Sequence, residues 1–138
     1  MYLKLAERLS PRKVAEALLP HLRPEQVDWD YENVYEWAYV DFPELAFSLN
    51  VTRDHGMSHI GDDVLAGLAP DEIEALPTAG PTYIFGWNRR SDSYVADLAN
   101  DLIQRISDSV QSEILIFPGR IDVDAVDPEP IGRRKPRF

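Results

Sequence analysis

The sequence predicts an α+β fold in which N-terminal helices precede a ββαβαβ core, with a mixed four- or five-stranded sheet covered mainly by helix 92–110. Three observations support this prediction. Apolar residues alternate with small or polar ones over 45–52, which is the period of a half-buried strand. Apolar residues recur with a helical period over 92–110. Strand-like runs at 82–88 and 113–117 flank that helix, so the three elements predict a right-handed β-α-β unit with two parallel strands.

The N-terminal residues predict two short helices. Residues 2–9 combine apolar and charged side chains as in an amphipathic helix. Ser10 and Pro11 then have the residue types of an N-cap and a first helical position, so a second helix is expected over 11–19. Its apolar stripe comprises Val14, Leu18 and Leu22.

Residues 28–53 predict a β-hairpin with Pro43 and Glu44 as its turn. The core-facing side is apolar and comprises Ala38, Val40, Phe42, Leu45, Phe47 and Leu49. The other side carries Tyr35, Trp37, Tyr39 and Asp41 opposite Thr52, Asn50, Ser48 and Ala46. A four-residue loop would keep these faces, whereas a three-residue loop would exchange them. The aromatic side is therefore either a second core covered by the N-terminal helices or a binding surface.

The strand predicted over 82–88 places its own large rings, Tyr83, Phe85 and Trp87, on one face. Gly86 between them indicates a bulge or a close backbone approach. The helix that follows begins at the cap-like residues 91–93. Its buried stripe comprises Val95, Leu98, Leu102, Ile106 and Val110.

Residues 1–126 are expected to form one globular domain, ending in a short edge strand over 120–126. Residues 127–138 have too little apolar content to pack and predict a disordered basic tail. Four of the chain's 14 basic residues lie in that tail, so the rest is even more acidic than the net charge of −10 indicates. Between Arg23 and Arg53 every charged side chain is acidic.

This charge distribution disfavours nucleic acids and anionic membranes as partners and favours basic proteins. The sequence lacks cysteine, which excludes disulfides and thiolate chemistry, and it has no apolar run long enough to span a membrane. We therefore expect a cytoplasmic protein without a cofactor. No phosphate-binding glycine loop and no nucleophile elbow occurs in the sequence.

One segment could hold a metal ion. His55, His59 and Asp63 could gather around zinc and serve a small metal-dependent hydrolase. However, Gly56 and Gly61 would interrupt the helix that normally places two such histidines on one face, and a solvated loop is the simpler interpretation.

The aromatic and acidic hairpin is the leading candidate site. We interpret the chain as a non-enzymatic module that binds a basic protein, with aromatic anchors surrounded by carboxylates that steer the partner. The predicted partner-binding residues are Asp28, Trp29, Asp30, Glu32, Tyr35, Trp37, Tyr39 and Asp41. In size and charge alone the chain resembles bacterial immunity proteins and antitoxins, although no motif identifies one of those families. A structural homodimer, formed through the aromatic face, is a further hypothesis.

Overall fold

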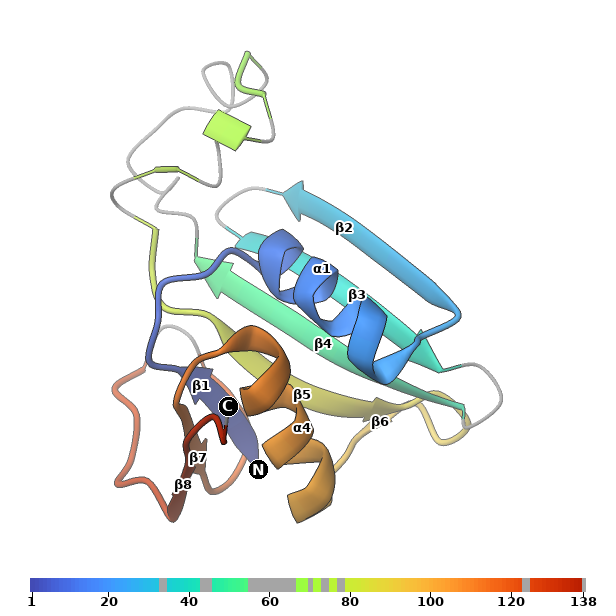
Figure 1. Cartoon of the computed structure of the whole chain (residues 1–138), viewed down its shortest axis with the longest axis vertical. Helices are drawn as coiled ribbons and strands as arrows, with labels where there is room; N and C mark the ends of the chain where they lie inside the picture. The colour runs from blue at the N-terminus through green and yellow to red at the C-terminus, as the bar shows by residue number, and fades with distance from the viewer. Residues whose placement is uncertain are drawn as a thin grey trace.

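A computed structural model describes residues 1–32, 35–42, 46–54, 67–69, 71–72, 75–76, 79–122 and 125–137, with only the backbone of 29–32 and 35. Its centre is one sheet in the order β2-β3-β4-β5-β1-β7-β8, with β6 paired to β5 (Figure 1). Every strand pairing in the described part of the chain is antiparallel. The strands are β1 (Tyr2–Leu5), β2 (Gln26–Glu32), β3 (Tyr35–Phe42), β4 (Phe47–Asp54), β5 (Tyr83–Asn88), β6 (Ser93–Tyr94), β7 (Ile114–Phe117) and β8 (Gly132–Arg134).

The predicted fold class is wrong, because the residues that the structure describes form mostly an antiparallel sheet of eight strands, with only two short helices. The first element is a strand instead of a helix, and β1 lies in the middle of the sheet between β5 and β7. β5 and β7 both run antiparallel to β1, so they are parallel to each other but not neighbours. The insertion of β1 between them replaces the predicted mixed sheet by an antiparallel one.

Helix α1 (Pro11–Leu22) begins where the sequence predicts. Ser10 is its N-cap, and its Oγ accepts a hydrogen bond from the backbone N–H of Lys13 at 3.1 Å. Val14 and Leu18 are fully buried, and Leu22 is nearly so. The helix packs over β2, β3 and β4, as Figure 1 shows, so its apolar stripe covers one half of the sheet.

Helix α4 (Asn100–Val110) is shorter than the predicted helix 92–110. Asp92 has a left-handed backbone with φ of 49°, and residues 93–94 pair with β5 as strand β6. The predicted cap is therefore a β-turn, and the helix starts only after Ala99. Its buried side chains, Ile103, Ile106 and Val110, join the same core as α1, so the two helices lie on one face of the sheet (Figure 1).

Gly86 confirms the expectation of a close approach. A Cβ atom built there would lie 2.8 Å from Leu98 Cδ2 and 3.0 Å from Phe47 Cε2. Gly86 also accepts a hydrogen bond from the N–H of Val95 at 3.0 Å. The residue thus lets the segment before α4 lie directly on the sheet.

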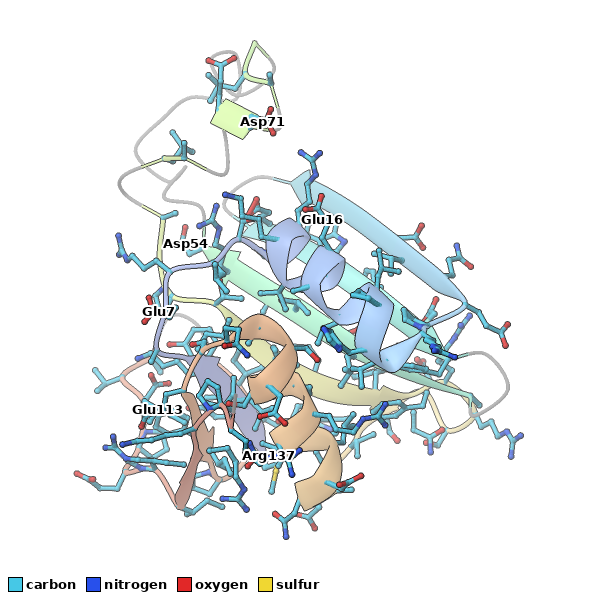
Figure 2. The ribbon with its side chains drawn as sticks, in the orientation of Figure 1. Glu7, Glu16, Asp54, Asp71, Glu113 and Arg137 are labelled. Atoms are coloured by element: carbon cyan, nitrogen blue, oxygen red, sulfur yellow. The ribbon has the colours of Figure 1, made fainter. Side chains whose placement is uncertain are left out.

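The C-terminal residues extend the fold. Within the segment for which composition predicts disorder, β8 pairs with β7, and Arg137 donates to the Asp108 carboxylate on α4 at 2.6 Å. Figure 2 shows Arg137 beside α4. The hydrogen bond from Arg137 lowers the pKa of Asp108 to about 2. The predicted edge strand at 120–126 is absent from the residues of that range that the structure describes.

Across the described segments, neither helix has the length and apolar character that a membrane span needs.

Candidate partner-binding face

The β3–β4 hairpin presents its aromatic residues on the side away from the helices. Phe42 pairs with Phe47, so four residues connect the strands instead of the predicted two. This longer loop moves each cross-strand partner by two positions and leaves both faces as predicted. Trp37 now lies opposite Thr52, and Tyr39 lies opposite Asn50.

Strand β5 continues this aromatic side. Phe85 pairs with Asn50 and Trp87 pairs with Ser48, so these rings share the face of Tyr39. We call this surface the open face, and it comprises Trp37, Tyr39, Asp41, Ser48, Asn50, Phe85 and Trp87. The rings of the hairpin and those of β5 therefore form one surface across three strands.

The helices do not cover the open face. Ala38, Val40, Leu49 and Val51, which alternate with its residues, are fully buried beneath α1 and α4. The alternative in which the N-terminal helices turn Trp37 and Tyr39 into a second core is therefore wrong. Tyr39 is 40% exposed, and Trp37 and Trp87 are half-buried.

Next to the open face, on the same side of the sheet, lies a small second core. Tyr2, Tyr83 and Phe117 are buried there, and the Tyr2 and Phe117 rings stack with centroids 5.1 Å apart. The C-terminal segment contributes Ile121 and the carboxylate of Asp127. The second core thus marks where the open face ends.

Asp127 fastens this second core. Its carboxylate accepts hydrogen bonds from the Tyr2 hydroxyl at 2.8 Å, the Lys4 Nζ at 2.9 Å and the Tyr83 hydroxyl at 3.1 Å. Burial acts to raise the pKa of Asp127, but these hydrogen bonds outweigh it, and the pKa lies below its usual value. Burial followed by the Asp127 charge and hydrogen bond raises the pKa of Tyr83 to about 12. Asp127 is therefore a structural carboxylate.

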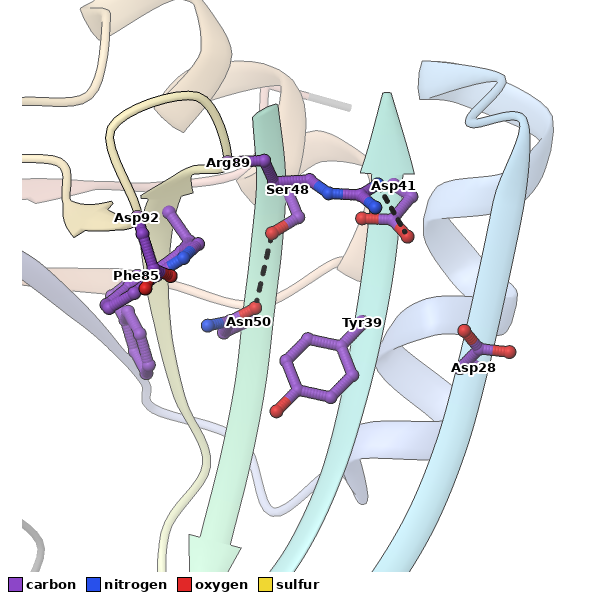
Figure 3. A pocket seen from close by; sticks show the side chains of 9 residues that line it. Asp28, Tyr39, Asp41, Ser48, Asn50, Phe85, Arg89 and Asp92 are labelled. Atoms are coloured by element: carbon purple, nitrogen blue, oxygen red, sulfur yellow. Dashed lines mark hydrogen bonds and ion pairs between the residues drawn. The ribbon is translucent and has the colours of Figure 1, made fainter. Parts of the chain in front are cut away.

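The open face contains a shallow concavity with a volume of about 510 Å³ (Figure 3). Its floor and rim combine aromatic, polar and charged groups: Asp28, Tyr39, Asp41, Ser48, Asn50, Phe85, Trp87, Arg89 and Asp92. Ser48 Oγ donates to Asn50 Oδ1 at 3.4 Å on the floor. Arg89 Nη1 lies 3.3 Å from Asp41 Oδ2 at one end. Three carboxylates and one guanidinium give this concavity a negative balance.

The predicted partner-binding residues divide into three groups. Asp28, Tyr39 and Asp41 line the concavity, and Trp37 lies beside it on the open face. The backbone of Asp30 pairs with that of Trp37, and the backbone of Glu32 pairs with that of Tyr35. The side chains of Asp30, Glu32 and Tyr35 lie outside what the structure describes. The same limit applies to Trp29, whose backbone pairs with Ala38.

The alternative metal residues, His55, His59 and Asp63, lie outside the described residues. Within the residues that are described, no group of histidine and carboxylate side chains could hold a metal ion.

The predicted partner-binding residues omit six residues of the concavity, namely Ser48, Asn50, Phe85, Trp87, Arg89 and Asp92. The alternation of the strands placed the first four on the aromatic faces without assigning them to the site, whereas Arg89 and Asp92 were missed altogether. Both lie in the turn between β5 and β6. The apolar residues after this turn have helical spacing, so the sequence predicted the start of a helix there. The residues Asn88 and Asp92, which favour turns, were the available signal. The concavity thus depends on a turn whose type the sequence did not reveal.

Comparisons of the chain with models of protein families, with curated proteins and with solved structures give no match.

Proposed function

We propose that the protein is a non-enzymatic binding module that engages a basic protein through the open face. The observation that carries this proposal is the position of the aromatic rings of β3 and β5, on the side of the sheet opposite both helices. Large rings on such a surface are typical anchors of protein interfaces. Monomers seldom leave a broad aromatic surface without a function.

The charge around the rings supports a basic partner. Asp28 and Asp92 are exposed at the rim of the concavity, and Asp41 lies at its end. The whole chain has a net charge of −10, which would accelerate the approach of a cationic protein and repel nucleic acid. An inhibitor of immunity or antitoxin type, which plugs the cationic active site of a toxin, would use this chemistry.

Affinity capture with matched variants tests the proposal. The full chain would be used as bait in a lysate of its source organism, together with Trp37→Ala, Tyr39→Ala and Asp28→Lys. Leu19→Ala is the control, because Leu19 is an exposed apolar residue on α1, on the other side of the sheet. We expect a basic protein to be captured by the wild type and by Leu19→Ala and lost from the three face variants.

Circular dichroism of each bait keeps the result interpretable. Tyr39 and Asp28 are exposed, so their substitutions should leave the fold intact. Capture that is equally strong with folded Tyr39→Ala and Asp28→Lys would contradict the proposal. Sedimentation at two concentrations adds a second check, since a dimer lost in Tyr39→Ala would assign the face to self-association instead.

A further inference from the structure

We infer that the concavity recognises an arginine side chain of the partner, and that Arg89 holds this place in the free protein. The inference rests on the proposed function and names the chemistry of recognition. It follows from the surroundings of Asp41, from the exposure of the Arg89 guanidinium and from the aromatic side chains that border the concavity.

Asp41 is the most enclosed carboxylate of the concavity. Its side chain is only 13% exposed, whereas Asp28 and Asp92 are exposed. A carboxylate that is mostly removed from water requires a cation or hydrogen-bond donors nearby. Among the described residues, Arg89 is the cation that reaches Asp41. The environment of Asp41 therefore suits a guanidinium group.

Arg89 is fixed at its backbone and accessible at its guanidinium. Its N–H donates to the Ala46 carbonyl at 2.8 Å, which ties the β5–β6 turn to the end of the β3–β4 loop. The side chain is 50% exposed and crosses toward Asp41 near Ser48, as Figure 3 shows. Because the guanidinium is half exposed, an incoming cation can take its place beside Asp41 and keep the enclosed carboxylate paired.

The walls favour a guanidinium over an ammonium. Tyr39 and Trp87 border the concavity that Asp41 closes at one end. A planar guanidinium can stack on such a ring while it pairs with a carboxylate, and an ammonium lacks this planar fit. Displacement of Arg89 would leave three carboxylates, Asp28, Asp41 and Asp92, to receive the incoming charge.

The test is a titration of the ¹⁵N-labelled full chain with tetra-arginine and tetra-lysine peptides, followed by NMR. We expect tetra-arginine to bind at least about threefold more tightly than tetra-lysine, with shifts centred on residues 39–41 and 85–89. Arg89→Ala should lower the Kd for tetra-arginine by about two- to fivefold relative to Arg90→Ala. Arg90 is the matched control, because it is the exposed neighbouring residue in the same turn and does not line the concavity. Asp41→Asn should remove the preference for arginine.

The outcomes separate the inference from the proposed function. Equal Kd values for Arg89→Ala and Arg90→Ala, or equal binding of the two peptides at the open face, would overturn the inference and leave the proposed function standing. Shifts confined to α1 and α4, or no binding of either peptide, would contradict both. Arg89 is half exposed, so its variant should fold and can decide the question even if Asp41→Asn lowers stability.

Discussion

Arg53 Nε lies 2.6 Å from Glu36 Oε1, and the two residues face each other directly across β3 and β4. Glu36 is fully buried and Arg53 is 4% exposed, on the helix-covered side of the sheet. Two buried charges lose their hydration, and their mutual attraction offsets this loss only while both are present. The pair therefore makes the end of the hairpin intolerant of a change in either partner.

Loss of one partner should be costly. We expect Arg53→Met to lower the free energy of unfolding by about 3–5 kcal/mol, because the Glu36 charge would stay buried without Arg53. The double variant Glu36→Met/Arg53→Met should lose much less than the sum of the two single variants. Urea denaturation of all four proteins measures this coupling, and additive losses would show that the two charges do not depend on each other.

Gly86 should tolerate no side chain. The Cβ of Gly86→Ala would meet Leu98 and Phe47 inside normal contact distance, so we expect a loss of about 1–3 kcal/mol of stability. Adding Leu98→Val should recover part of this loss by making room. Gly80→Ala is the control, since its nearest contact would be 3.4 Å. Equal effects of Gly86→Ala and Gly80→Ala in urea denaturation would refute the packing explanation.

Asp127 should make stability sensitive to acid. Its pKa is lowered in the folded protein, so its contribution is present above the unfolded value of about 3.9 and is lost as the pH falls through the folded value. We expect Asp127→Asn to be less stable than the wild type at pH 7 by about 1.5–3 kcal/mol. This difference should shrink below about pH 4. Thermal unfolding at pH 7 and pH 3 measures both effects. Glu129→Gln is the control, because Glu129 is an exposed acid nearby, and it should change neither the stability at pH 7 nor its dependence on pH.

Tyr2, which is buried, and Tyr94, which is half-buried, should make stability sensitive to alkali. Burial is the main cause that raises the pKa of Tyr94 to about 12, and it also raises that of Tyr2. A raised pKa gives stability that is present below about pH 10, the unfolded value, and is lost as the pH rises toward the folded value. Absorbance at 295 nm should therefore show some tyrosines ionising only as the fold unfolds. Complete ionisation near pH 10 with unchanged circular dichroism would disprove this.

The residue pattern predicted the faces of the hairpin better than its register. Alternation over 45–52 identified the two sides of the second strand. Any loop with an even number of residues then places Trp37, Tyr39 and Asp41 together on the side away from the core. The loop length depends on backbone conformations such as the left-handed Ala46, with φ of 50°, which side-chain polarity does not encode. The surface was therefore predictable, whereas the partner of each residue across the strands was not.

Strand β1 shows why the fold class was wrong. In Tyr2–Leu5 the apolar and polar positions of four residues fit a helix and a strand equally well. Its true partners, Ile84 and Ile116, are about eighty and more than a hundred residues away along the chain. Pairing at such a distance depends on the assembled core and leaves no local signal. Val95 and Leu98 were assigned to the predicted helix for a related reason. Their spacing fits a helix, but it also fits the segment before α4, in which both side chains pack against Gly86.

The central place of β1 also bears on the order in which the protein acquires its structure. The β3–β4 hairpin closes over a short loop and can form early, whereas β1 must wait for chain as distant as Phe117 before both of its edges are paired. During synthesis, Leu3 and Leu5 therefore leave the ribosome long before any partner strand exists. Closing such long-range pairs costs more loop entropy than closing the hairpin, so we expect the sheet around β1 to form after the β3–β4 hairpin.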